Sequence, residues 1–150
     1  MAKFVDTQHS PYSPRQVYDL VADVKRYPEF LPWCRAARIL EWPEPNIFLA
    51  ELVIAYKQFR ESYTSRVELL PGMTENDLHV INVRMVQGPF HHLTNGWKFL
   101  PEAGGGTQIE FELDFAFRSS LLEKMIGGFF GRAAGKMGEA FKQRADQLYG

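Results

Sequence analysis

Side chains that could act as catalysts or metal ligands are few in this chain and are scattered along it. The histidines are His9, His79, His91 and His92, and the single cysteine is Cys34. His91 and His92 are adjacent, so in a strand they would point to opposite faces and make a poor pair of metal ligands. No Cys/His spacing is typical of zinc. We therefore expect no metal site.

The acidic and glycine-rich stretches also lack a catalytic pattern. Glu110, Glu112 and Asp114 alternate with apolar residues, which is typical of the solvated face of a strand. Residues 104–106 are consecutive glycines, but the Lys-Ser/Thr pair of a phosphate-binding loop does not follow them. No side chain stands out as a nucleophile or a general acid or base, so we expect no catalytic residue.

The composition is that of an ordinary soluble domain. The chain has 150 residues, 45% of them hydrophobic, with 17 basic and 18 acidic side chains. This length predicts a single domain over residues 1–150, and the near-neutral charge does not favour nucleic-acid binding. Residues 1–10 lack the regions of a signal peptide, and no apolar run approaches the ~18 residues of a membrane span. We expect a cytoplasmic protein that can act peripherally on the inner face of the cell membrane.

Alternating apolar residues and turn signals predict a meander of strands between two helical stretches. A strand at 3–8 precedes a helix that begins at Ser13-Pro14 and ends at Tyr27-Pro28, and residues 119–150 form a long helix without proline. This order predicts an α+β fold in which the terminal helix lies across the apolar face of a curved antiparallel sheet. The later strands are expected at 37–41, 47–56, 60–70, 76–87, 93–100 and 109–117.

The terminal helix combines an apolar stripe with an unusual number of glycines. At about 100° per residue the apolar residues share one broad face. The glycines lie opposite, although each costs roughly 1 kcal/mol relative to alanine. The stripe comprises Leu122, Ile126, Phe129, Phe130, Ala133, Met137, Ala140 and Phe141, and the glycines are Gly127, Gly128, Gly131, Gly135 and Gly138.

One face of the predicted sheet is strongly aromatic. A curved sheet closed by a helix either fills its concave face with side chains or leaves a pocket, and pockets for small molecules are mostly apolar. The residue pattern alone leaves both alternatives open. The residues of this face are Phe48, Leu52, Tyr63, Trp97, Phe99, Phe111, Phe115 and Phe117.

Several motifs, in the same order over nearly the whole chain, resemble those of a known family. They are residues 27–34 (YPEFLPWC), 61–67 (ESYTSRV), 88–90 (GPF), 93–99 (LTNGWKF) and 111–122 (FELDFAFRSSLL). Together they resemble the coenzyme Q-binding START-like proteins of the polyketide cyclase and lipid-transport superfamily, whose bacterial relatives include the ribosome association toxin A type. The resemblance implies the helix-grip fold, in which a seven-stranded curved antiparallel sheet wraps around a long C-terminal helix, with short helices after the first strand.

The resemblance also implies a cavity for a hydrophobic small molecule, with ubiquinone as the leading candidate. On this analogy the protein is not an enzyme but carries the quinone in support of respiration and ubiquinone biosynthesis, so that ubiquinone is a bound ligand and not a cofactor. Together with the face pattern, the resemblance assigns ligand binding to Phe30, Leu31, Pro32 and Trp33 near the mouth, to Gly88, Pro89 and Phe90 at the rim, to Tyr63, Trp97, Phe99, Phe111, Phe115 and Phe117 on the sheet, and to Leu122, Ile126 and Phe129 on the helix.

Uptake of such a ligand from a bilayer needs a gate, and the first half of the terminal helix is too apolar around its circumference for packing alone. Leu121, Met125 and Phe130 are expected to touch a membrane surface transiently, and Gly127-Gly128 is expected to act as a bend or hinge. A hydrogen-bond donor to the quinone oxygens could come from Tyr63, Asn95, Arg84 or Trp97, among which the sequence does not choose.

Two other functions are alternatives. A ribosome-directed toxin-type protein, interfering with subunit association, would need an exposed patch that binds the large subunit, and the near-neutral charge gives it little support. An aromatase/cyclase or dehydratase enzyme would need an acid or base inside the cavity, and the inward-facing positions supply almost none.

Overall fold

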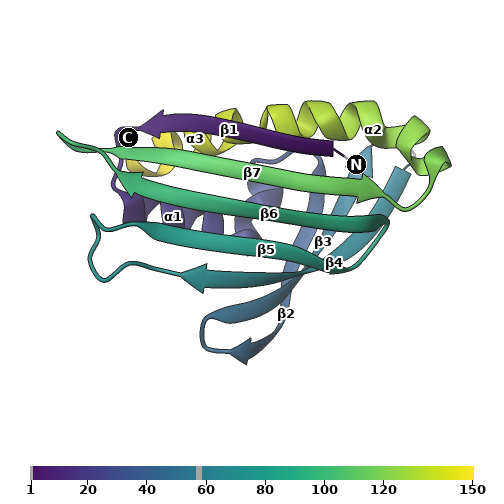
Figure 1. Cartoon of the computed structure of the whole chain (residues 1–150), viewed down its shortest axis with the longest axis horizontal. Coiled ribbons are helices and arrows are strands. Elements are labelled where there is room, and N and C mark those ends of the chain that lie inside the picture. The colour runs from purple at the N-terminus through teal and green to yellow at the C-terminus, as the bar shows by residue number, and fades with distance from the viewer. Residues whose placement is uncertain (1, 57–58) are drawn as a thin grey trace.

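The structure, a computed structural model, describes residues 2–56 and 59–150. Its main element is a seven-stranded antiparallel sheet in the order β1-β7-β6-β5-β4-β3-β2, with the helices on its concave side (Figure 1). The strands are β1 (Ala2–Ser10), β2 (Cys34–Glu44), β3 (Ile47–Tyr56), β4 (Phe59–Leu70), β5 (His79–Gln87), β6 (Phe90–Pro101) and β7 (Thr107–Phe117). The helices are α1 (Pro14–Ala22), the 3-10 helix η1 (Val24–Glu29), α2 (Ser120–Gly135) and α3 (Met137–Tyr149).

The strands follow the predicted two-residue alternation. In β3 the inward residues Phe48, Ala50 and Leu52 are buried, and in β7 Phe111 is buried while Glu112 is exposed. The predicted fold class, a seven-stranded curved sheet with short helices after β1, is confirmed. The alternation places one continuous apolar face on the concave side of the sheet, where the helices cover it.

The first helix ends earlier than the sequence predicts. Helix α1 stops at Ala22, and Asp23, with a ψ of 68°, turns the chain out of the α conformation. The next residues form η1, a 3-10 helix that contains Pro28 and ends at Glu29, so the proline ends neither α1 nor η1. Strands β2, β6 and β7 are longer than predicted, and β5 begins later, at His79.

The single terminal helix expected over 119–150 is also wrong, because the structure divides it at Lys136. Lys136 has φ −100° and ψ 0°, and its N–H bonds to carbonyl groups of the preceding turn. Helix α3 lies close to β1, since a Cβ atom on Gly138 would come within 2.6 Å of Asp6 Oδ2 and 3.0 Å of Gln8 Cγ. The break lets α3 take this close position while α2 runs past the start of β1 to the far end of the sheet (Figure 1).

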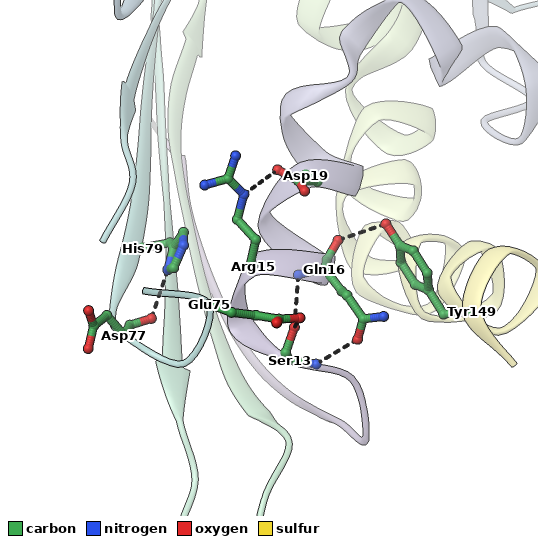
Figure 2. A network of polar contacts seen from close by, with 8 residues as sticks. All are labelled: Ser13, Arg15, Gln16, Asp19, Glu75, Asp77, His79 and Tyr149. Atoms are coloured by element: carbon green, nitrogen blue, oxygen red, sulfur yellow. Dashed lines mark hydrogen bonds and ion pairs between the residues drawn. The ribbon is translucent and has the colours of Figure 1, made fainter. Parts of the chain in front are cut away.

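Polar contacts fix α3 to the N-terminal part of the fold. The side chains and backbone N–H groups of Ser13 and Gln16 form a capping box at the start of α1. Tyr149 of α3 donates a hydrogen bond of 3.0 Å to the Gln16 carbonyl (Figure 2), and Tyr12 donates one of 2.7 Å to Asp146 of α3. Each of the two C-terminal helices has two buried residues, Ile126 and Ala134 in α2 and Phe141 and Ala145 in α3. No helix among the described residues is long and apolar enough to cross a bilayer.

Candidate functional site

A cavity of about 90 Å³ lies between the concave face of the sheet, η1 and the two C-terminal helices. The strands contribute alternate residues because every second side chain faces inward, and α2 and α3 contribute the apolar stripe predicted from the sequence. The lining comprises Val21, Val24, Tyr27, Trp33, Ala50, Leu52, Ile54, Tyr63, Ser65, Val67, Ile81, Val83, Leu93, Asn95, Trp97, Phe111, Leu113, Phe129, Phe130, Ala133, Ala134, Met137 and Phe141.

The lining contains no carboxylate, imidazole, ammonium or guanidinium group among the described residues. Its ionisable side chains are the phenols of Tyr27 and Tyr63, and burial raises the pKa of both well above the ordinary value of 10.0. Both therefore stay protonated at neutral pH and can donate a hydrogen bond. Tyr27 uses its hydroxyl to donate to the Val21 carbonyl at 2.5 Å. The cavity can thus hold an uncharged apolar molecule, and it offers a few polar groups to orient it.

One polar group on the wall stands out because it has no partner. Ser65 is 3% exposed, and its Oγ atom makes no hydrogen bond to any described residue. It follows a register shift between β4 and β5, where Thr64 pairs with Gln87 and Ser65 with Met85. Sequence reasoning did not single out Ser65, although its place between Tyr63 and Val67 on the inward face of β4 was a usable signal. An unpaired buried hydroxyl is unfavourable, so this serine requires an explanation.

Helix α2 closes one end of the cavity through aromatic contacts. Phe129 stacks on Tyr56, at the end of β3, with ring centroids 4.0 Å apart. Phe130 packs against Phe90, Phe115 and Phe117 at 5.1, 4.6 and 5.8 Å. These ring contacts hold α2 over the sheet, whereas α3 is also held by hydrogen bonds.

Five of the residues predicted to bind the ligand reach the cavity: Trp33, Tyr63, Trp97, Phe111 and Phe129. The structure places the other eleven outside the lining. Five of them are buried in the core outside the lining: Leu31, Phe90, Phe99, Phe115 and Ile126. Phe30 packs on Phe141, and Pro32 is exposed. Gly88, Pro89 and Leu122 border a separate surface groove, and Phe117 borders another with Gly127 and Gly128.

The predicted gate residues have a mixed outcome. Leu121 and Met125 are 68% and 59% exposed, as expected for residues that could touch a membrane. Phe130 instead points inward and lines the cavity. The hinge at Gly127-Gly128 stays a prediction: α2 is continuous through both glycines, and the chain breaks further on, at Lys136.

The predicted hydrogen-bond donors are also separated by the structure. Tyr63, Asn95 and Trp97 line the cavity, but Arg84 lies on the outer face of the sheet, in a groove with its register partner Arg66. The reason is the alternation in β5, which points Ile81 and Val83 inward. No group of three metal-ligating side chains occurs among the described residues.

Comparison with known proteins identifies the family. The family model described as polyketide cyclase / dehydrase and lipid transport matches residues 10–142. The chain belongs to this family. The family resemblance seen in the sequence motifs is thereby confirmed.

Two relatives and one solved structure illustrate the range of similar proteins. The ribosome association toxin RatA of Rickettsia prowazekii is 40% identical over 148 residues, covering 99% of each chain. The coenzyme Q-binding protein COQ10 homolog B of Xenopus laevis is 31% identical over 143 residues, covering 93% of this chain and 56% of that one. The Zhui aromatase/cyclase of Streptomyces sp. R1128 has a TM-score of 0.81 over 97% of this chain and 94% of that one, and at 19% identity it shows the fold alone.

Proposed function

We propose that this protein binds ubiquinone in the cavity and carries it between the membrane and other proteins, in support of respiration and ubiquinone biosynthesis. The observation that carries the proposal is an apolar cavity with polar but uncharged groups in its wall. Such a site suits an isoprenoid quinone, since burial of its tail gains about 25 cal/mol per Å² of apolar surface. The 31% identity to a coenzyme Q-binding protein supports the choice of ligand.

The cavity in this structure is too small for the whole ligand. Its volume of about 90 Å³ is below the roughly 300–1,000 Å³ of typical ligand pockets. Binding must therefore move part of the wall outward. Helix α2 is the part that we expect to move, because its contacts to the strands are aromatic packing, whereas hydrogen bonds also hold α3. In this proposal α2 is a lid that moves with Lys136 as its hinge.

The outer side of this lid fits a membrane surface. Leu121 and Met125 are exposed there, and helical spacing places Arg132 on the same side. Between residues 118 and 136 the chain carries four basic side chains and one acidic side chain. An anionic lipid surface would attract such a segment. The lid would then open where the ligand resides, on the inner face of the cell membrane.

Several observations favour carriage over catalysis. Enzymes that act by general acid–base catalysis need a group whose pKa lies near the working pH. The two phenols of the cavity have raised pKa values, which makes them poor bases. An aromatase/cyclase function has the solved structure of the Zhui enzyme in its favour, but that likeness extends to the fold alone.

Extraction of the purified protein tests the proposal. Organic solvent should release a quinone that mass spectrometry identifies, and the emptied protein should bind added ubiquinone, seen as quenching of Trp33 and Trp97 fluorescence. Protein that yields no quinone and shows no saturable quenching would contradict the proposal.

Ribosome association is the second candidate, favoured by the 40% identity to RatA. Arg66 and Arg84 are directly opposite each other on the outer sheet face, an arrangement that is unfavourable without an anion and that suits an RNA phosphate. Glu68, Glu112 and Asp114 border the same groove and make its charge mixed, which is why carriage is the first proposal. Co-sedimentation with the large ribosomal subunit, lost in Arg66→Ala/Arg84→Ala, would support this candidate.

A further inference from the structure

We propose that Ser65 is the hydrogen-bond anchor of the cavity, and that the ligand it selects is a neutral ring bearing carbonyl oxygens, not a hydrocarbon or a fatty acid. This inference rests on the proposed function as a hydrophobic-ligand carrier and names the chemistry of the ligand head. Its basis is the geometry around Ser65 and the chemistry of the rest of the wall.

The hydroxyl of Ser65, a residue that is 3% exposed, is buried at the cavity wall and has no partner among the described residues. A buried hydroxyl without a partner is destabilising. Alanine or valine would fill this position without that cost, so a serine here is best explained by a partner that arrives with the ligand.

The partner must be uncharged. A carboxylate or phosphate inside the cavity would need a cation or several donors around it, and the described lining has no lysine, arginine or histidine. Ionised fatty acids and phospholipid head groups are therefore disfavoured in the deep part of the site, because no cation there can pair with them. A carbonyl oxygen is an acceptor that a single hydroxyl can satisfy.

A second polar group, Asn95, lies two strands away from Ser65 and is offset by two residues, since Asn95 and Val67 both pair with Val83. Ser65 lies on β4 and Asn95 on β6, with β5 between them, and both side chains line the cavity. Strands β4 and β6 are thus about 10 Å apart. A ring with oxygens on opposite sides, as in a para-quinone, fits between two such donors, and Trp97 and Leu93 supply apolar surface beside it.

The position of Ser65 also orients the ligand. Strand β4 begins at Phe59, so Ser65 lies about 20 Å along the strand from that end. The same end of the sheet holds Tyr56, on which Phe129 of α2 stacks. With the ring at Ser65, an isoprenoid tail would run along the cavity toward the lid.

Direct binding measurements test the anchor. The probes are ubiquinone with a two-unit isoprenoid tail, a carbonyl-free methylated benzene with the same tail, and palmitate, each titrated by tryptophan fluorescence. Wild type should bind the quinone about three- to tenfold more tightly than the carbonyl-free ring, and palmitate more weakly than either. Ser65→Ala should lose this preference for the quinone, while Ser65→Thr, which keeps the hydroxyl, should retain it.

Ser62→Ala, an exposed serine on the same strand, is the matched control and should bind all probes as wild type does. Equal quinone affinity in Ser65→Ala and wild type, with thermal unfolding showing both folded, would overturn the anchor but leave the carrier function standing. Palmitate binding as tight as quinone binding would overturn the ligand class. If wild type bound neither ring, the proposed function would fail as well.

Discussion

At the scale of single residues, the unpaired hydroxyl of Ser65 should lower the stability of the ligand-free protein. Replacing it with alanine removes a buried hydroxyl that has no partner, so Ser65→Ala should raise the free energy of unfolding of the ligand-free protein by about 1 kcal/mol. Urea denaturation measures the change, and Ser62→Ala should stay within about 0.5 kcal/mol of wild type. A loss of stability in Ser65→Ala would mean that the hydroxyl is already bonded in the empty protein.

A buried thiol and two buried phenols should make the stability of the fold decrease at alkaline pH. Burial raises the pKa of the Cys34 thiol from 9.0 to about 11, and it raises the pKa of Tyr27 and Tyr63 above 10.0. The folded protein thus holds these protons more tightly than the unfolded chain does. Their contribution to stability is complete below pH 9 and is lost as pH rises toward and beyond 11.

Denaturation at pH 8 and at pH 10.5 checks this expectation. The free energy of unfolding should be lower at pH 10.5, and Cys34→Ala should show a smaller decrease because the thiol no longer titrates. An identical decrease in the variant would show that Cys34 does not contribute.

The site residues were predicted as far as strand alternation could predict them. Tyr63, Trp97 and Phe111 reach the cavity because they are large inward-facing residues of a one-sided sheet. Ser65 was missed because a small polar residue on an inward face does not reveal from sequence whether it has a partner. Phe90 and Phe99 were misplaced because alternation gives the face of a residue but not its distance from the cavity.

At the scale of elements, the glycines of α2 should set how easily the lid moves. A Cβ atom on Gly131 would meet nothing within 4 Å, and one on Gly128 only Arg132 Nη1 at 3.5 Å. Gly128→Ala and Gly131→Ala should each stabilise the helix by about 1 kcal/mol. A stiffer lid should open less often, so stopped-flow fluorescence should show slower ubiquinone release.

Gly138→Ala is a control for which the expected change in stability has the opposite sign. An alanine there would press on Asp6 and Gln8 of β1, so Gly138→Ala should lower stability instead of raising it. Unchanged release rates in Gly128→Ala/Gly131→Ala, with the expected gain in stability, would show that exchange does not depend on the rigidity of α2.

Most of the elements were predictable because the strands alternate and most of the connections contain a glycine or a proline. The break at Lys136 was not, because the apolar stripe continues from Ala133 through Met137 to Phe141 without a gap. The break depends on where α3 must lie relative to β1, which is a tertiary contact centred on Gly138. A helix pattern records which face is apolar but not whether two halves of that face cover different parts of a sheet.

At the scale of the whole molecule, the two ends of the cavity differ in how they are closed. At the α3 end, Phe141 packs on Tyr27, Phe30 and Trp97 at 5.4, 5.1 and 5.2 Å, and Arg144 pairs with Glu29 at 2.6 Å. At the α2 end the closure is aromatic packing. Separating α2 from the sheet breaks ring contacts, whereas separating α3 would break ring contacts and hydrogen bonds. The first should cost less free energy, so the molecule should open at α2.

The exposed side of α2 should therefore be the surface that meets the membrane. Leu121→Glu/Met125→Glu places two acids where the proposal needs apolar contact and should abolish binding to vesicles containing anionic lipid, measured by flotation. Both side chains are exposed, so the fold should be unaffected. Met73→Glu, which alters a residue that is 97% exposed in the β4–β5 connection, should bind vesicles as wild type does.

Varying the salt concentration and the lipid charge separates the electrostatic contribution to vesicle binding from the apolar contribution. Attraction of Lys124, Arg132 and Lys136 to anionic lipid should weaken at high salt, because screening shortens the reach of exposed charges, whereas the apolar contact of Leu121 and Met125 should not. Vesicle binding in the acidic variant equal to that of wild type would show that α2 is not the docking surface. Ubiquinone transfer from vesicles to the protein should be slowed in the same variant, while affinity for short-tailed quinone in solution stays unchanged, because the substituted side chains lie outside the cavity.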